Sequence, residues 1–347
     1  MSQSKVENRS LTDVRNQIDN LDNKIFKQLL ERAEIIRLVQ EAKQNGVKTA
    51  YFRPSREAQI IRRLISKIPE DSLLTQRMVF DVWRAIINNT LAMEHDFEIA
   101  LLVCDEHLKQ NTNNNQELPS LVEAIDMVRE CIGFQPIRGV HDIEELVRRV
   151  LVKPEETENE TRVTMGFVQI SNAALWRDHL HDVLLKYDPN ESWIRAPNVT
   201  MSVPFLYPKK HKRGFFISHS IVEESGNDIT LINIRLMANH NTSREHPFTL
   251  SDMTNIIREC LNSCNISVLE AEFSEGFLDT NLDIHKDHYL YSALIELDGF
   301  FHCQGKLQDM TPSFKGILGE HNISLYRDNV IEIARLGGYA KPIVGME

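Results

Sequence analysis

Apolar residues recur at helical spacing over the first part of the chain. From Leu11 to Val39 they fall every three or four residues, and no proline or glycine interrupts them before Gly46. Ser10, followed three residues later by Asp13, is typical of a helix start in which each residue caps the other. The pattern predicts one helix of about 33 residues, roughly 50 Å long. Such a helix cannot bury its apolar stripe alone, so it must lie along other helices or a partner chain.

Two more helices are predicted before the pattern changes near Phe97. Beyond that point strands and helices alternate, which indicates an α/β region. The predicted helices lie at 55–67, 73–96, 121–131, 142–151 and 173–187, and the predicted strands at 99–103, 162–170, 199–205 and 214–218.

A third unit begins near Asp228, and its elements follow the order of ferredoxin-like folds. In sequence they are a strand at 229–236, a helix at 250–264, strands at 266–272 and 289–297, a helix at 305–320 and a strand at 331–336. The chain is therefore predicted to be multidomain. An all-α helical-bundle domain at residues 1–97 precedes an α/β region at 98–227 and a ferredoxin-like α+β region at 228–347.

Composition narrows the classes of function. The net charge of −11 argues against a general nucleic-acid binder, and no apolar run approaches the ~20 residues of a membrane span. Residues 1–97 carry 16 Lys or Arg and 13 Asp or Glu, whereas the rest of the chain carries 23 and 37. A mildly basic segment in an acidic protein suits a small anionic ligand. The five scattered cysteines indicate reduced thiols in a cytoplasmic protein, and their spacing predicts no metal site.

Helical geometry relates three cations on the first helix. Arg32 and Lys43 are 11 residues apart, so they point the same way about 16 Å from each other. Arg15 precedes Arg32 by 17 residues, which places it about 25 Å along the axis and roughly 100° around it. If all three serve one pocket, Arg15 must come from a second, antiparallel chain.

Two further polar pairs fall on the predicted helices. Thr90 and Glu94 share one face, four residues apart, within an otherwise apolar stretch, and Arg56-Glu57 begins the short helix. Taken singly, each of these residues is more simply explained as a solvated side chain. A helical dimerisation arm without catalysis is the corresponding alternative for the whole segment.

Together these residues resemble the all-helical chorismate mutases in order and spacing, over about residues 10–96. The matching segments are Val14-Arg15-Asn-Gln-Ile-Asp-Asn-Leu-Asp22, Leu29-Leu30-Glu31-Arg32, Ala42-Lys43, Arg56-Glu57 and Ile86-Ile87-Asn-Asn-Thr90-Leu-Ala-Met-Glu94. The resemblance implies an intertwined helical homodimer that rearranges chorismate to prephenate without a cofactor.

The resemblance also implies a role for each matching residue. Arg32 and the partner chain's Arg15 would hold the two carboxylates of chorismate. Lys43 and Glu94 would flank the ether oxygen, whose bond to carbon breaks. The other matching residues would line the pocket: Arg56 beside the substrate, Glu57 as acceptor from the ring hydroxyl, and Thr90 near a carboxylate.

The chemistry fits these roles. A pericyclic rearrangement needs no nucleophile, so catalysis must come from a compact near-attack geometry and from stabilising negative charge on the ether oxygen. Arginine forks suit carboxylates, and lysine suits a single oxygen. A glutamate at position 94 donates a hydrogen bond only when protonated, so activity should decline as pH rises. Arg53 stands where several relatives carry an acidic residue, so the hydroxyl end of the pocket should differ.

The remainder resembles the dehydratase and ACT regions of the bifunctional chorismate mutase–prephenate dehydratases. Tyr289 to Gly299 and Leu336-Gly-Gly-Tyr339 resemble ACT strand and closing segments. An aromatic amino acid is then the expected effector, although the small residues expected around Pro247-Phe-Thr-Leu250 are missing. The dehydratase Thr-Arg-Phe motif is replaced by Lys212-Arg-Gly-Phe-Phe216, so we expect a degenerate dehydratase-like unit without that activity.

Four functions therefore remain in competition. The first is a chorismate mutase whose C-terminal region regulates or scaffolds. The others are a bifunctional mutase–dehydratase, a non-catalytic ligand-sensing protein, and an isochorismate pyruvate lyase on the same helical fold.

Overall fold

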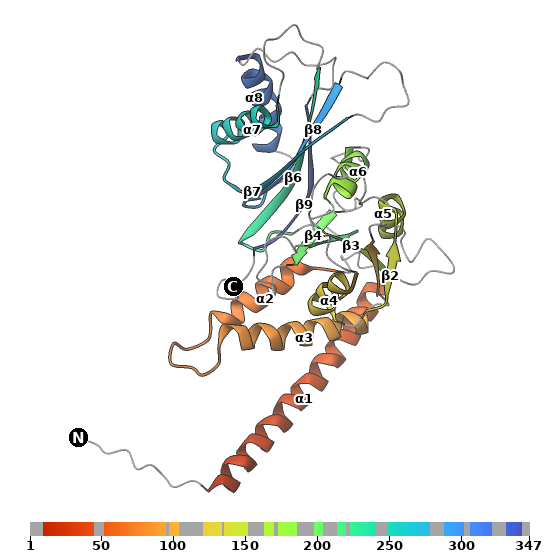
Figure 1. Ribbon diagram of the computed structural model, residues 1–347. Coiled ribbons are helices and arrows are strands. Elements are labelled where there is room, and N and C mark those ends of the chain that lie inside the picture. The colour runs from red at the N-terminus through yellow and green to blue at the C-terminus, as the bar shows by residue number, and fades with distance from the viewer. Residues whose placement is uncertain are drawn as a thin grey trace, which may run out of the picture.

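The computed structural model describes most of the predicted elements (Figure 1). The described residues are 10–44, 52–94, 97–103, 121–133, 135–151, 163–169, 173–185, 198–203, 214–219, 223–239, 249–277, 288–301, 306–320 and 331–341. The helices are α1 (Leu11–Gln44), α2 (Pro54–Ile65), α3 (Gln76–Glu94), α4 (Leu121–Ile132), α5 (Ile143–Leu151), α6 (Ala173–Leu185), α7 (Leu250–Ser263) and α8 (Lys306–Glu320). The strands are β1 (Phe97–Leu102), β2 (Ile137–Val140), β3 (Val163–Gln169), β4 (Asn198–Val203), β5 (Gly214–Ser218), β6 (Asp228–Asn239), β7 (Val268–Phe277), β8 (His288–Asp298) and β9 (Ile331–Ala340).

The long first helix begins at the predicted capping box. The Ser10 backbone N–H donates to Asp13 Oδ2 at 3.3 Å, and the Asp13 backbone N–H donates to Ser10 Oγ at 3.1 Å. Residues 10–31 are exposed throughout, and α1 first packs against α3 over its last turns, where Ile36 is buried. Figure 1 shows the N-terminal half of α1 projecting away from the rest of the chain. No helix in the described part of the chain is long and apolar enough to cross a membrane.

The nine strands form one sheet, in the order β2-β1-β3-β5-β4-β9-β6-β8-β7. Its first five strands come from the predicted α/β region and its last four from the predicted ferredoxin-like region. The last four pair in antiparallel fashion, with β6 between β9 and β8, as expected for the βαββαβ order. The two groups meet where Val199 of β4 pairs with Gly337 of β9.

The ferredoxin-like half of the sheet is covered on both faces. Helices α7 and α8 lie on one face of β6 and β8, and α6 lies on the other (Figure 1). Along β6, Ile232 and Ile234 enter the core beneath α7 and α8. Asn233 and Arg235 alternate with them and point toward α6.

A third apolar core joins the helical unit to the α/β region. Phe52, just before α2, and Leu91 of α3 pack in one cluster with residues of β1, α4 and β3. Phe52 is 1% exposed, so its burial depends on both regions. The helical unit therefore shares a core with the sheet.

Three details of the sheet differ from the prediction. Strand β2 was not predicted, because Ile-Arg-Gly-Val is short and only Val140 of the four is buried. Strand β9 runs four residues beyond Leu336, through two glycines, and buries Tyr339. Strand β7 begins at Val268 and continues to Phe277, because its later residues also pair with β8.

Helix α2 is anchored on the turn that precedes β6. Arg62 Nη1 donates to Ser225 Oγ at 2.8 Å, and Nη2 donates to the backbone oxygens of Asn227 at 3.0 Å and Lys341 at 2.7 Å. Burial lowers the pKa of Arg62 from its ordinary value, and the nearby Asp228 carboxylate partly opposes that shift. One arginine of α2 thus binds the segments that begin and end the ferredoxin-like unit.

The junction of the two sheet halves gives a first prediction, for Gly337→Ala. Gly337 has φ +149°, and an added Cβ would lie 2.0 Å from the backbone oxygen of Val199. Backbone strain and overpacking should together lower the free energy of unfolding by about 3 kcal/mol. Urea denaturation measures the change. The control is Gly316→Ala in α8, where nothing lies within 4 Å of an added Cβ. That change should raise stability by about 0.5–1 kcal/mol, and equal stabilities for the two variants would contradict the prediction.

Candidate active site

The first contact of the candidate site joins α1 to α3. Arg32 Nη1 donates to Thr90 Oγ1, and Thr90 Oγ1 donates to the backbone oxygen of Ile86 at 2.7 Å. Thr90 is buried and Arg32 is half-buried. A hydroxyl that donates to its own helix presents its lone pairs to the guanidinium in a fixed direction. The structure thus brings together two of the residues predicted from the sequence.

The second contact joins α2 to α3 and includes Arg84, a residue that was not among those predicted from the sequence. Arg84 Nη1 donates to Glu57 Oε2 at 2.5 Å; Glu57 is buried and Arg84 is mostly buried, with side-chain exposures of 12% and 13%. Arg84 Nη2 donates to the backbone oxygen of Cys131, in the last turn of α4. The Arg84 guanidinium, which belongs to α3, therefore connects this helix to α2 and α4.

A signal for Arg84 was present in the sequence. On α3, Arg84 shares a helix face with Ile87 and Leu91, at spacings of three and seven residues, and both of those are buried. A cation in an apolar stripe must be paired or at the edge of the core. It was missed because it belongs to none of the segments that resemble the mutases.

The remaining side chains at the start of α2 face the C-terminal region or solvent. Arg56 is exposed, and its Nη1 donates to Gln59 Oε1 at 3.3 Å. Arg53 forms a two-pronged ion pair with Glu223, with distances of 2.7 and 2.9 Å from Nη2 to the two carboxylate oxygens. Arg53, which departs from the pattern of related mutases, is thus engaged by the segment leading into β6.

Among the other predicted residues, Arg15 lies far from Arg32 in this chain. Arg15 is exposed on the projecting half of α1, 17 residues and about 25 Å from Arg32 along the helix. Lys43 lies in α1 and Glu94 in α3, but their side chains lie outside the described residues. One chain thus assembles Arg32 with Thr90, and Glu57 with Arg84.

Residues 14–95 match the family model of chorismate mutase type II. This segment is a chorismate mutase domain. The match spans α1, α2 and α3, and therefore both contacts that link these helices.

The chain is also similar to solved structures, at low scores. Prephenate dehydratase from Streptococcus mutans aligns with 12% identity and a TM-score of 0.34, covering 70% of this chain and 98% of that chain. An amidase of the hydantoinase/carbamoylase family from Burkholderia phymatum aligns with 7% identity and a TM-score of 0.17, covering 32% of this chain and 30% of that chain. At these values neither likeness supports a conclusion about activity. A comparison with curated proteins found no match.

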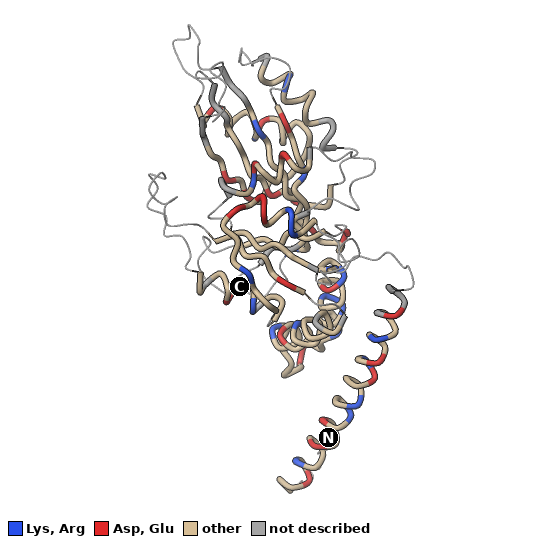
Figure 2. The backbone as a smooth tube through the Cα atoms, turned by 90° about the vertical axis from the view of Figure 1, so that its right-hand side faces the viewer, with Lys and Arg blue, Asp and Glu red and all other residues tan. Residues whose placement is uncertain are grey.

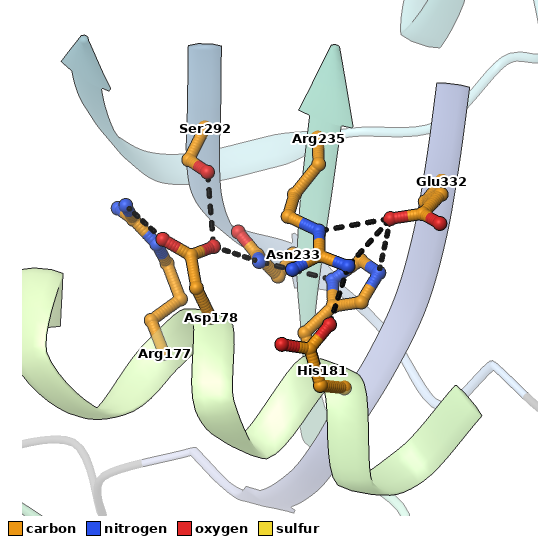
Figure 3. Close-up of polar contacts among 8 residues, drawn as sticks. Arg177, Asp178, His181, Asn233, Arg235, Ser292 and Glu332 are labelled. Carbon is orange, nitrogen blue, oxygen red and sulfur yellow. Dashed lines mark hydrogen bonds and ion pairs between the residues drawn. The ribbon is translucent and has the colours of Figure 1, made fainter. Parts of the chain in front are cut away.

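Outside the mutase domain, a buried polar cluster lies between α6 and the sheet (Figure 3). Asp178 of α6 accepts from Asn233 Nδ2 at 3.0 Å and Ser292 Oγ at 2.9 Å, and from Arg177 at 3.2 Å. Burial opposes ionisation of this carboxyl, yet the Arg177 charge and these hydrogen bonds hold the pKa of Asp178 below its ordinary value. The cluster therefore contains a half-buried carboxylate whose hydrogen bonds fix α6 to β6 and β8.

A second group of ion pairs extends the cluster to β9. Arg235 of β6 donates to Asp182 Oδ1 at 2.6 Å and to Glu332 Oε2 at 2.5 Å. Burial alone would lower the pKa of Arg235, but the two carboxylates raise it above its ordinary value. These contacts hold α6 across neighbouring strands.

His181 is at the centre of this cluster and is fully buried. Asn233 Nδ2 lies 3.0 Å from His181 Nδ1, and because an amide nitrogen only donates, Nδ1 is the acceptor. The ring proton is thereby assigned to Nε2, which lies 3.8 Å from Glu332 Oε2. Burial, followed by the charge of Arg235, lowers the pKa of His181 to about 3. The ring is therefore neutral near pH 7, and it contributes packing and a hydrogen bond.

This histidine should make the protein sensitive to acid. The pKa of His181 is about 3 in the folded chain against 6.5 ordinarily, so the unfolded chain binds the proton more readily. The stability that the neutral His181 ring contributes is complete above pH 6.5 and is lost as the pH falls toward 3. We expect the free energy of unfolding to drop by about 2 kcal/mol between pH 7 and pH 5 through this group.

Urea denaturation at the two pH values measures the drop, and His181→Gln should remove most of it. The matched control is His179→Gln, two residues earlier on α6, where the ring is partly exposed. That variant should keep the pH dependence of the wild type. An unchanged slope in His181→Gln would show that other groups cause the acid sensitivity.

Proposed function

We propose that this protein is a chorismate mutase, an intramolecular transferase that converts chorismate to prephenate in the synthesis of aromatic amino acids. The observation that carries the proposal is the Arg32–Thr90 contact, within a segment that matches the chorismate mutase type II family. A buried threonine that fixes an arginine fork between two helices suits recognition of a carboxylate.

The proposed mechanism uses position and charge. Arg32 binds one carboxylate of chorismate, with Thr90 orienting it, and Arg56 lines the pocket. Glu57 accepts from the ring hydroxyl, while Lys43 and Glu94 flank the ether oxygen. The substrate is thus held compactly, with cationic and hydrogen-bonding groups where negative charge develops. No bond to the protein forms.

We further propose that the enzyme is a homodimer in which a second copy covers α1. The helix exposes a long row of large apolar side chains, which water penalises. They are Leu11, Val14, Ile18, Leu21, Ile25, Phe26, Leu29, Leu30, Ile35, Leu38 and Val39. Figure 2 shows Lys/Arg and Asp/Glu interspersed along the same helix, so its charges do not oppose close approach of an antiparallel copy. The partner would bring its Arg15 to the Arg32 pocket.

The region beyond the mutase domain is proposed to regulate or scaffold. We assign residues 98–227 to a degenerate dehydratase-like unit and 228–347 to an ACT-like unit. The stretch that replaces the dehydratase Thr-Arg-Phe motif lies largely in β5, where Phe215 and Phe216 are both buried. Core rings at this place support the absence of dehydratase activity. An aromatic amino acid is the proposed effector. Its loop would lie at Pro247-Phe-Thr-Leu250, of which residues 247 and 248 are outside the described residues.

A cytoplasmic location is part of the proposal. Cys131, Cys260 and Cys264 form no disulfide bond. Burial raises the pKa of Cys260 to about 12, so this thiol is unreactive. Cysteines that form no disulfide suit a reducing compartment.

Product identification tests the function directly. The full-length protein should consume chorismate and release prephenate as the sole product. Phenylpyruvate after longer incubation would indicate a bifunctional mutase–dehydratase, and pyruvate would indicate a lyase. Intact chorismate would mean that the helical domain serves ligand sensing or assembly only.

Subunit exchange tests the composite site. Arg15→Ala and Lys43→Ala should each be inactive alone. After mixing and exchange, half of the dimers carry one intact site of two, so activity should recover to about one quarter of the wild-type value. A mixture of Arg32→Ala with Lys43→Ala should stay inactive, because one chain supplies both residues. Recovery in neither mixture would refute the shared site even if the enzyme is active.

A further inference from the structure

Helix α2 presents Glu57 to α3, and Arg84 meets it there. The two side chains form a buried ion pair, with 2.5 Å between Arg84 Nη1 and Glu57 Oε2. A carboxylate offers about four lone-pair sites, and the bond from Arg84 Nη1 uses one of them. The pair therefore does not exclude Glu57 from its proposed role.

The pairing with Arg84 contributes to the charge and the direction of Glu57. A buried carboxylate without a cation becomes protonated or turns toward water, because an uncompensated charge in the core is costly. A protonated carboxyl would use one oxygen as a donor. Without Arg84, Glu57 would thus lose part of its ability to accept from a hydroxyl.

Arg84 is itself fixed by the α/β region. Its second nitrogen, Nη2, donates to the backbone oxygen of Cys131, near the C-terminus of α4. The carbonyls at a helix C-terminus carry partial negative charge and favour a cation. The guanidinium is consequently held at both of its terminal nitrogens, at Nη1 by α2 and at Nη2 by α4.

We propose that Arg84 is a positioning residue for the mutase reaction, which holds the Glu57 carboxylate ionised and directed at the ring hydroxyl of chorismate. The inference rests on the proposed function and adds a residue outside the set that resembles the mutases. It also assigns α4, an element of the α/β region, a part in building the mutase pocket.

The test compares two substrates in the full-length protein: chorismate and an analogue that lacks the ring hydroxyl. In Arg84→Met, kcat/KM for chorismate should fall about ten- to hundredfold, as expected for a lost charged hydrogen bond. Most of the fall should appear in KM, and kcat/KM for the analogue should change less than about twofold. Arg84→Lys keeps the charge but not the fork, so it should restore part of the loss.

Two comparisons separate positioning from damage to the fold. Arg77→Met, two turns earlier on α3, removes an arginine whose pair with Asp81 is exposed, and both substrates should react as with wild type. Glu57→Gln should show the same selective loss as Arg84→Met, and the double variant should lose no more than either single one. If Arg84→Met does not fold, Arg84→Lys and Glu57→Gln carry the comparison.

The outcomes are distinct. An equal loss for both substrates, or kinetics like those of Arg77→Met, would overturn the positioning role while leaving the mutase assignment intact. A wild-type protein that leaves chorismate unchanged would overturn the proposed function and this inference together.

Discussion

The arrangement of the mutase domain depends on one short helix that must satisfy two neighbours. On one side α2 gives Glu57 to the buried pair with Arg84. On the other, Arg62 binds the backbone at both ends of the ferredoxin-like unit. Neither contact can move without the other, because a helix of three turns behaves as a rigid body. The proposed pocket residues of α2 are thus placed by the C-terminal regions as much as by α1 and α3, and any change in the turn before β6 reaches the pocket through this helix.

The helices and strands were largely predictable because their buried residues follow the helical period of about 3.6 residues or the strand period of about two. Helix α7 buries one face in the core and exposes the other, and β6 alternates Ile232, Asn233 and Ile234 between two layers. The continuity of the sheet was not predictable. It depends on Val199 meeting Gly337, two residues far apart in sequence whose pairing leaves no mark in local hydrophobicity. Strand β2 was not predicted for a related reason, since an edge strand of four residues needs only one buried side chain.

The candidate site shows the same division between local and distant information. Arg32 and Thr90 could be found because each stands in a recognisable segment, and the structure brings them into contact. Arg84 belongs to no such segment, and its importance lies in partners from α2 and α4. The alternation along β6 predicts that Asn233 points away from α7 and α8. Its contact with the buried His181 could not be predicted, because it depends on where α6 lies in the fold. A buried polar group needs a hydrogen-bond partner, and that partner usually comes from an element distant in sequence, which the tertiary fold brings near.

The exposure of helix α1 changes at Arg32, the first residue of the proposed pocket in this chain. From Ser10 to Glu31 every position is exposed, and the first described contact of α1 with α3 is that of Arg32 with Thr90. Within one chain the described N-terminal part of the helix is therefore uncovered up to the residue that contributes to the proposed pocket. Arg15, the remaining cation of the resemblance, lies on the uncovered part, among the apolar residues that most need a partner. In the proposed homodimer, hydrophobic burial and completion of the pocket come from the same event, the approach of a second α1. A protein under selection for catalysis alone would have no reason to keep so long an apolar helix in water, whereas a composite site gives both the length and the exposure a cause.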